Sequence, residues 1–293
     1  MANIELSRGE RLDQRVVSLL PTLSRSFATR LIDEGKVTVN GVVATKGGLK
    51  LRLADEVVVD YDPASFTIPD IELPILYEDN DCVVIVKPVG LLTHSKGAFN
   101  PEPSVATWLH GRIKDEVLLD QDKNSLNNRA GIVHRLDRAT SGVMICAKTP
   151  KALAHLQKQF AQRKTKKTYA AVVAGELKEP EAVIDMPIGR NPKAPATFRV
   201  DVQGKASVTH YRTVASNGKH SLLELKPTTG RTHQLRVHLN HLGHPIVGDH
   251  MYGGEPADRL FLHAEELEIT IPKNSERKVF RAPIPLEFQE LIG

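Results

Sequence analysis

The first sixty residues carry apolar positions at helical spacing, followed by short β-branched runs. A helix is expected over residues 10–20, because apolar side chains recur there every three or four positions and Pro21 then ends the pattern. A second helix should begin at Ser24, a residue type that caps helix N-termini, and end at Gly35, a residue type common after helix C-termini. The sequence therefore predicts two consecutive short helices.

A β-hairpin should follow these helices. Val37–Val39 and Val42–Val43 are β-branched runs separated by Asn40-Gly41, and an Asn-Gly pair favours the two-residue turn of a hairpin. Val57–Val59 is expected to add a third strand. The first part of the chain is thus predicted to be a compact helix–helix–hairpin unit.

Beyond Ile75 the apolar positions form continuous or alternating runs that are typical of β-strands. Two longer segments, residues 152–163 and 232–242, have helical spacing instead. The expected fold class is α+β, with a mixed and largely antiparallel sheet in this second part. The predicted strands lie at residues 75–78, 82–88, 142–148, 167–175, 207–215 and 220–227.

This change of pattern divides the chain of 293 residues into two expected domains. The first should span residues 5–62 and the second residues 74–293, joined by a proline-rich linker over residues 63–73. Residues 98–128 are polar and irregular, and we expect them to form an insertion over the core of the second domain.

Positive charge is concentrated in the first domain. Between Arg8 and Arg52 there are nine Lys and Arg against four Asp and Glu, and this surplus of five exceeds the net charge of +4 of the whole chain. A basic cluster in one small unit is typical of a surface that binds phosphates. We therefore expect a nucleic acid as the partner of this domain.

Composition disfavours several classes of protein. The N-terminus has no apolar stretch of signal-peptide length, and no run approaches the ~18 apolar residues of a membrane span, so we expect a cytoplasmic protein with no membrane partner. Cys82 and Cys146 each lie in an apolar run, which indicates buried thiols rather than a disulfide. Neither a P-loop nor a glycine-rich dinucleotide motif occurs.

The basic unit resembles the S-four type of RNA-binding domain, with LIDEGKVTVNG at residues 31–41 as its most specific string. The resemblance implies that the two helices present a basic face to structured RNA. Arg25 and Arg30 on the second helix, and Lys36 just after it, are then the expected RNA-binding residues. The alternative is that these cations form an ordinary solvated face.

The most informative segment of the second domain runs from Ile132 to Thr149, where Asp137 lies between Arg135 and Arg138 at the entry to an apolar strand. Nearby positive charge favours the ionised form of a carboxylate. In an extended segment, Arg135 and Asp137 point the same way because they are two residues apart. By itself this pattern fits a reactive carboxylate and a structural Arg–Asp pair about equally well.

The string HRLDRATSG at residues 134–142 resembles the signature loop of the RluA family of pseudouridine synthases. Five further segments resemble motifs of that family and occur in the family's order, although residues 98–128 match poorly. An ordered set is far more specific than any single motif. The five are KPVG at 87–90, KKTYAAVVAG at 166–175, PIGR at 187–190, GKAS at 204–207 and GRTHQLRVHLNHLGHPIVGD at 230–249.

The resemblance implies a pseudouridine synthase fold and four site residues. Asp137 would be the catalytic carboxylate, and Arg135 would help to hold the displaced nucleotide and the vacated stack. Tyr169 would pack against the target base and act in proton transfer. Arg231 would pair with Asp137 and set its position.

Turning uridine into pseudouridine exchanges a C–N glycosidic bond for a C–C bond to the same base. The reaction includes no redox step and no phosphate transfer, so we expect neither a nucleotide cofactor nor a metal. It needs a carboxylate that acts as a nucleophile or as a base, and an aromatic side chain against the flipped base. The resemblance favours large-subunit ribosomal RNA as the partner, with tRNA as the alternative, and we expect a monomer.

Two other classes of function remain open at this point. Five histidines cluster in the C-terminal third and could belong to a metal-dependent nuclease or hydrolase, namely His233, His238, His241, His244 and His250. No carboxylate or cysteine stands at zinc-ligand spacing. A ribosome assembly factor that binds RNA without catalysis would explain the basic domain. It gives no reason for an aspartate held between two arginines.

Overall fold

The computed structural model describes residues 9–21, 23–61, 69–94, 102–115, 118, 129 and 131–293. The chain divides into two compact units, which are described separately: unit 1 is Met1–Ile71 with His94–Ala130, and unit 2 is Glu72–Thr93 with Gly131–Gly293. The domain boundaries expected from the sequence stay predictions. Residues 63–68 of the expected linker lie outside the described residues.

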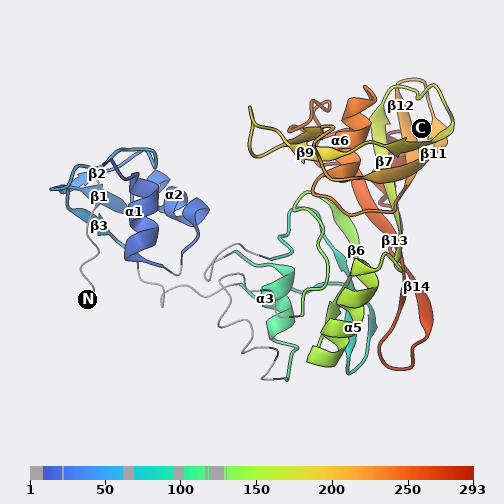
Figure 1. Ribbon diagram of the computed structural model, residues 1–293, viewed down its shortest axis with the longest axis horizontal. Helices are drawn as coiled ribbons and strands as arrows, with labels where there is room; N and C mark the ends of the chain where they lie inside the picture. Colours follow the sequence, from blue (N-terminus) through green and yellow to red (C-terminus); the bar gives the residue numbers. More distant parts are fainter. Residues whose placement is uncertain are drawn as a thin grey trace. The chain divides into compact units, whose positions relative to one another are not determined.

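Unit 1 contains the predicted helices and hairpin (Figure 1). Ser24 caps the second helix as expected, since its hydroxyl accepts a hydrogen bond from the backbone N–H of Phe27 at 3.2 Å. Asn40 and Gly41 both have positive φ angles, 52° and 76°, as the two-residue hairpin turn requires. The elements are α1 (Leu12–Leu19), α2 (Arg25–Asp33), β1 (Val37–Val39), β2 (Val42–Val43) and β3 (Val57–Val59), with strand order β2-β1-β3.

The two helices and the small sheet of unit 1 share one apolar core, to which Leu12, Phe27, Ile32 and Val37 contribute. A further helix, α3 (Val105–His110), belongs to the same unit and begins with a capping box between Ser104 and Thr107. It falls within residues 98–128, which were expected to be an irregular insertion. The remainder of that segment is largely outside the described residues.

Unit 2 is built on a nine-stranded sheet with the order β4-β5-β6-β13-β7-β12-β11-β8, and β14 pairs with β13. All pairings in it are antiparallel except that of β6 with β13, so the sheet is mixed and largely antiparallel, as predicted. The six predicted strands are β4 (Ile75–Glu78), β5 (Cys82–Lys87), β6 (Ser141–Ala147), β7 (Lys166–Ala174), β11 (Val208–Ser216) and β12 (His220–Pro227).

Sequence patterns did not reveal several shorter or more polar elements of unit 2. β9 and β10 form a separate two-stranded sheet rather than extending the large one. The elements that were not predicted are β8 (Glu181–Asp185), β9 (Ile188–Arg190), β10 (Phe198–Val200), β13 (Leu262–Thr270), β14 (Arg277–Arg281) and α7 (Leu286–Glu290).

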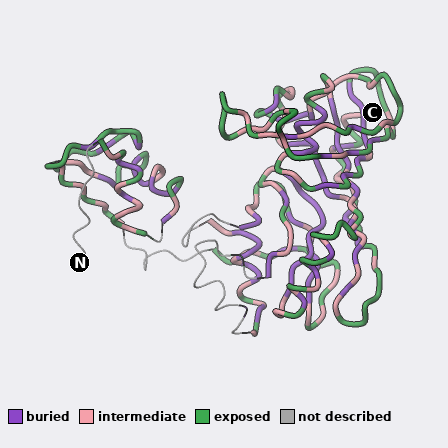
Figure 2. Tube along the Cα trace, viewed as in Figure 1, coloured by how far each residue is buried: buried purple, intermediate pink, exposed green. Residues whose placement is uncertain are grey.

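Two helices cover the large sheet, as Figure 1 shows for α5 (Pro150–Ala161) beside β6 and for α6 (Gln234–His241) near β7 and β12. Ala152 and Leu156 of α5 pack into one apolar cluster with β5, β6 and β13. Leu235 and Leu239 of α6 pack into a second cluster with β7 and β12. Burial is most complete along β5 and β6, and buried residues, drawn in purple in Figure 2, gather in the interior of unit 2.

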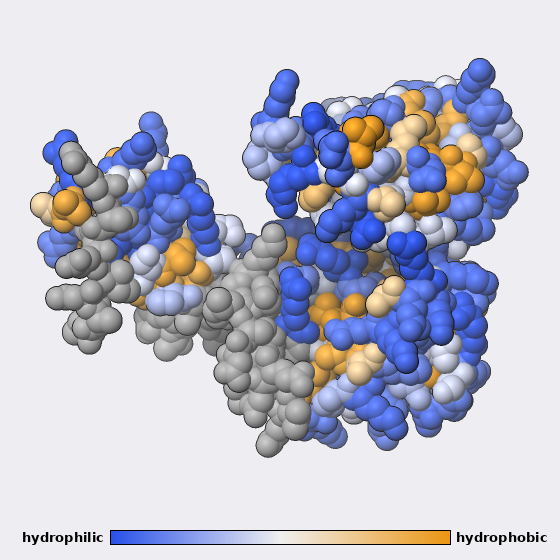
Figure 3. Space-filling model, viewed as in Figure 1, coloured by the Kyte–Doolittle hydropathy of each residue, from blue (hydrophilic) through white to orange (hydrophobic). Residues whose placement is uncertain are grey.

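The surface of unit 2 is predominantly hydrophilic on the face seen in Figure 3, with apolar residues in small scattered groups. No helix among the described residues is long and apolar enough to span a membrane. Cys82 and Cys146 are both buried, and neither forms a disulfide, as the sequence predicted.

Candidate active site

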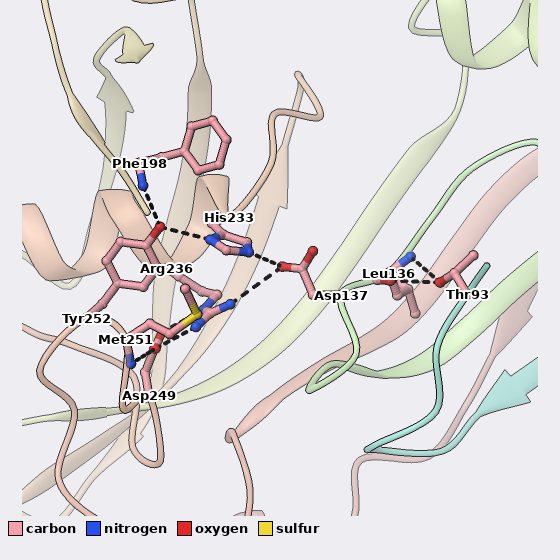
Figure 4. Close-up of polar contacts among 9 residues, drawn as sticks. All are labelled: Thr93, Leu136, Asp137, Phe198, His233, Arg236, Asp249, Met251 and Tyr252. Atoms are coloured by element: carbon pink, nitrogen blue, oxygen red, sulfur yellow. Dashed lines mark hydrogen bonds and ion pairs between the residues drawn. The ribbon is translucent and has the colours of Figure 1, made fainter. Parts of the chain in front are cut away.

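Asp137 lies on the loop between Ile132 and β6, and this loop is anchored from the side of β5. The hydroxyl of Thr93 donates a hydrogen bond to the carbonyl of Leu136 at 2.7 Å and accepts one from the N–H of the same residue at 3.3 Å (Figure 4). The backbone N–H of Gly90 donates to the carbonyl of Arg138 at 2.8 Å. The residues on both sides of Asp137 are therefore held by the segment that follows β5.

Lys87 strengthens this anchor from inside the protein. Its side chain is fully buried, and its ammonium group donates to the carbonyls of Pro88, Leu91 and Arg138 at 2.9, 2.9 and 3.3 Å. An ammonium group has three donors, so these carbonyls satisfy it completely. The motif KPVG thus fixes the far end of the Asp137 loop.

The carboxylate of Asp137 has two basic neighbours, and both approach the same oxygen. Nε2 of His233 and a terminal guanidinium nitrogen of Arg236 each lie 3.8 Å from Oδ2 (Figure 4). Oδ1 has no ion-pair or hydrogen-bond partner among the described residues. Two basic groups therefore flank one oxygen of Asp137, and the other has no such neighbour among these residues.

Arg236 is held rigidly by a second carboxylate. Its guanidinium group donates two hydrogen bonds to Asp249, both at 2.7 Å, and the ring of Tyr252 lies over it at 5.0 Å. Burial alone would lower the pKa of Arg236, but the hydrogen bonds and charge of Asp249 keep that pKa above its ordinary value. A bidentate pair of this kind fixes both the charge and the direction of the guanidinium.

His233 has a defined tautomer because Tyr252 bonds to its other nitrogen. The backbone N–H of Phe198 donates to the hydroxyl of Tyr252 at 2.9 Å, and that hydroxyl lies 2.9 Å from Nδ1 of His233 (Figure 4). With the hydroxyl donating to Nδ1, the proton of a neutral His233 sits on Nε2 and faces Asp137. Burial lowers the pKa of His233, which favours this neutral form, although Asp137 acts in the opposite direction.

Tyr169 is placed on β7, between β12 and β13, opposite Leu225 and Ala264. Burial raises the pKa of its phenol above the usual range, and the charge of Asp137 raises it further. The phenol is therefore neutral at physiological pH and lies within electrostatic reach of the carboxylate.

All four catalytic residues predicted from the sequence line one cavity of about 450 Å³, namely Arg135, Asp137, Tyr169 and Arg231. His233 and Arg236 line it too, and it extends past Phe160, Arg163 and Lys167. A volume of this size falls in the range of small-molecule sites. The cavity combines a carboxylate, an aromatic ring and several cations.

The predicted pairing of Arg231 with Asp137 is wrong, because Arg236 takes that place. The helix was expected from residue 232, but α6 begins at Gln234 after His233, whose φ of 56° is left-handed. Arg231 therefore lies on the preceding loop, where its Nε donates to the carbonyl of Ala206 at 3.2 Å. Arg236 stands on the buried side of α6 and faces the carboxylate.

Sequence reasoning also missed the roles of His233 and Tyr252. His233 had been considered only as a possible metal ligand, and Tyr252 had not been considered at all. The available signal was that both lie within or just after GRTHQLRVHLNHLGHPIVGD. Arg135 lies on the same loop as Asp137, as expected, with an exposed side chain that lines the cavity.

The three predicted RNA-binding residues of unit 1 are all partly exposed, and each has an acidic neighbour. Arg25 pairs with Asp13 at 3.0 Å and Arg30 with Glu102 at 3.0 Å. Lys36 lies 3.4 Å from Asp60, which is itself largely exposed. The pairs of Arg30 and Lys36 are at least partly exposed on both sides, and such pairs are weak and can open when phosphates approach. Asp13 is buried and also bonds to Arg11.

The histidines do not form a metal centre among the residues that the structure describes. His238 is buried and bonds to Thr209 and to the carbonyl of Met186, at 3.0 and 2.9 Å. His244 bonds to the carbonyl of Ala174 at 2.8 Å. Their nitrogens therefore serve the packing of α6 against the sheet.

Comparison with known proteins gives the same picture for both parts of the chain. A family model described as RNA pseudouridylate synthase matches residues 81–241, and a model of the S-four domain matches residues 10–57. The ribosomal large subunit pseudouridine synthase D of Escherichia coli is 36% identical over 303 residues, which cover 97% of this chain and 90% of that protein. The protein of the same name from Nitrosomonas europaea is 37% identical, with coverage of 97% and 84%.

A solved structure is similar over most of the chain. Human RNA pseudouridylate synthase domain containing 1 matches with a TM-score of 0.57 and 28% sequence identity, over 72% of this chain and 83% of that one. A cyanobacterial relative from Synechocystis, named as an uncharacterized RNA pseudouridine synthase, is 36% identical over 97% of this chain and 88% of its own length.

Proposed function

Since the chain belongs to the RNA pseudouridylate synthase family, we propose that it isomerises particular uridines of large-subunit ribosomal RNA through the carboxylate of Asp137. The isomerase activity follows from the family. The ribosomal substrate is supported by the names of the bacterial relatives and by the S-four domain. A cytoplasmic monomer is the state that we propose for it.

One observation carries the role of Asp137: Arg236 and His233 flank its Oδ2, Oδ1 has no partner among the described residues, and the side chain lines the same cavity as Tyr169. In the reaction, the C1′–N1 bond of uridine breaks and a C1′–C5 bond forms. A carboxylate can drive this by attacking C1′ or by removing a proton from C2′. A fixed carboxylate with one free oxygen serves either route.

The other cavity residues have roles that follow from their positions. Arg236 and His233 orient the carboxylate, and the pair with Asp249 keeps Arg236 from moving toward solvent. Tyr169 offers a neutral ring against which the flipped uracil can pack. Arg135, exposed beside Asp137, is placed to contact the backbone of the displaced nucleotide.

The test is to map pseudouridines in the RNA of cells that lack this protein and then to restore single variants. We expect particular positions of the large-subunit RNA to lose pseudouridine. Wild type should restore them, and Asp137→Asn should not.

The matched control is Asp258→Asn, because Asp258 is exposed and outside the cavity. It should restore modification as well as wild type does. Restoration by Asp137→Asn would exclude the carboxylate mechanism, and losses confined to tRNA would replace the proposed substrate.

A further inference from the structure

Lys167 is a further charged group in the Asp137 cavity, and the strand pattern of β7 directs it there. Alternate residues of a strand point to the same side, so Lys167 and Tyr169 share one face. Lys166 points the other way, where it is exposed and pairs with Glu268 at 3.2 Å. Lys167 and Tyr169 both line the cavity.

The ammonium group of Lys167 has little to bind in the protein. Its one hydrogen bond goes to the carbonyl of Thr229 at a long 3.4 Å, and it has no carboxylate partner among the described residues. Burial lowers the pKa of Lys167, so its charge is poorly solvated. A partly buried cation without a counter-ion is costly, and such groups gather at functional sites.

Asp137, Tyr169 and Lys167 all line the cavity. Asp137 acts electrostatically on Tyr169, and Lys167 precedes Tyr169 by two residues, about 7 Å along the strand. If the ribose lies at Asp137 and the uracil packs on Tyr169, the far edge of the base points toward Lys167. That edge carries the O4 carbonyl, across the ring from N1.

We propose that Lys167 binds the carbonyl edge of the target uracil and stabilises the base as an anion once it is detached from the sugar. This inference rests on the proposed function of the same cavity. When the C1′–N1 bond breaks, both electrons stay with the base, and the negative charge spreads over N1, O2 and O4. A positioned cation is most effective where charge develops during the reaction.

The symmetry of uracil keeps this contact throughout the reaction. To bring C5 to C1′, the detached base turns over about the line through N3 and C6, which exchanges N1 with C5 and O4 with O2. The ammonium group therefore meets a carbonyl oxygen before and after the turn. C5 then bonds to C1′ and releases its proton to water, N1 takes up a proton, and the product has the composition of the substrate.

Cytosine would be a poor occupant of the same position. It carries an amino group instead of O4, and an ammonium donor cannot accept a hydrogen bond from it. Lys167 would thus favour uridine over cytidine at the step of base recognition as well as during bond cleavage.

The test compares Lys167→Met with Lys166→Met in single-turnover assays on a large-subunit RNA fragment. One fragment carries uridine at the target and the other carries 5-fluorouridine, whose fluorine makes the base a better leaving group. On uridine, Lys167→Met should be slower by about 100-fold, as for loss of one stabilising donor. On 5-fluorouridine, C5 carries fluorine instead of the proton that the last step releases, so cleavage of the C1′–N1 bond is followed there as loss of the substrate nucleoside. The loss in that rate should shrink to about 10-fold or less, because the fluorinated anion needs less help.

Several controls make the result specific. Lys166→Met should remain within roughly twofold of wild type on both substrates, since its side chain lies on the exposed surface. Lys167→Arg keeps the charge and should retain more activity than Lys167→Met. Melting curves of all variants report whether the fold is intact.

Two outcomes would overturn the role of Lys167 while leaving the proposed function standing. One is a wild-type rate for Lys167→Met on uridine. The other is an equal loss on both substrates, which would indicate a structural effect. If wild type converts no uridine of any RNA, the proposed function itself fails, and that result is distinct from both.

Discussion

Arg236 forms ion pairs with two carboxylates, and only one of them, that of Asp137, lines the cavity. Asp249 is buried and takes two of its hydrogen bonds at 2.7 Å, whereas Asp137 lies 3.8 Å away. The two hydrogen bonds to Asp249 fix the position of the guanidinium group. The longer contact then orients the carboxylate of Asp137 relative to that group. The reactive carboxylate is thus oriented by a residue that does not depend on it.

A first prediction concerns this buried pair. Asp249→Asn should destabilise the protein by about 3–5 kcal/mol, because it leaves the buried charge of Arg236 without its counter-ion. Activity should also fall, since Arg236 is then free to reorient. Urea unfolding followed by circular dichroism measures the loss of stability.

The matched control is Glu266→Gln, which removes the partner of the exposed Arg281 in a surface pair of 2.8 Å. Surface pairs contribute about 1 kcal/mol or less. If the two variants lost the same stability, Asp249 would not be the anchor of Arg236.

At the scale of elements, the parallel contact of β6 with β13 joins the Asp137 loop to the centre of the sheet. Gly142 is the second residue of β6, has a φ of 120°, and is paired with Ala264. A Cβ added to Gly142 would lie 2.2 Å from the carbonyl oxygen of Ala264. Only glycine lets the two backbones approach this closely at that conformation.

A second prediction follows for Gly142→Ala. Because the close contact is with backbone, either β6 or β13 must shift, and we expect a loss of stability above about 3 kcal/mol or a failure to fold. Gly218→Ala is the control, since Gly218 has a φ of 85° and nothing within 4 Å of the added Cβ. It should cost about 1 kcal/mol. Equal melting temperatures for the two variants would contradict the argument.

Elements whose determinants are local could be predicted from the sequence. The hairpin of β1 and β2 depends on Asn40-Gly41, and α2 depends on the cap at Ser24, so both were found. The alternation along β7 likewise places Tyr169. The contacts that complete the site join distant segments: Asp137 meets Arg236 across 99 positions of the sequence.

The choice between Arg231 and Arg236 shows why the remainder was not predictable. Both arginines occur in the same motif. Arg231 stands directly before the predicted helix and Arg236 lies within it. What separates them is the left-handed conformation of His233, which sets the start of α6. In that conformation the ring of His233 packs edge-on against Phe198 and Tyr252, and the local sequence does not reveal these contacts. β13 was missed because the charged residues of this strand interrupt its apolar alternation.

At the scale of the whole molecule, buried histidines link stability to pH. Burial lowers the pKa of His134 to about 3 and that of His263 to about 4, whereas a histidine of the unfolded chain titrates near 6.5. Below pH 6.5 the unfolded chain therefore binds more protons than the folded protein. Stability must fall as the pH falls from about 6.5 toward 4.

A third prediction is the slope of that fall. Each histidine should contribute up to about 1.4 kcal/mol per pH unit within the window, as measured by urea unfolding at several pH values. His134→Gln should reduce the slope, since its amide oxygen can still accept the N–H of Ile145 without titrating. His250→Gln, at an exposed position, should leave the slope unchanged. A slope that His134→Gln does not alter would count against burial as the cause.

The basic residues of unit 1 make a prediction for the full-length protein in complex with RNA. Each cation that contacts a phosphate releases about one counter-ion, so it steepens the fall of affinity with salt. Arg25, Arg30 and Lys36 are paired with carboxylates in the free protein, which means that RNA must compete with Asp13, Glu102 and Asp60. Breaking the partly exposed pairs of Arg30 and Lys36 costs about 1 kcal/mol or less each, which phosphate contacts can offset. Asp13 is buried, but it keeps Arg11 as a second partner when Arg25 turns toward a phosphate.

The triple variant Arg25→Gln, Arg30→Gln, Lys36→Gln should therefore weaken binding and lower the slope of log affinity against log salt by about two to three. Filter binding to a large-subunit RNA fragment between low and moderate salt measures that slope. The control replaces three exposed lysines of unit 2, Lys178, Lys219 and Lys273, by Gln, which changes the net charge equally. If both triple variants lowered the slope alike, general charge would explain the affinity and the helical face of unit 1 would have no special part in it. A smaller slope for the first variant alone would place the RNA backbone on α2.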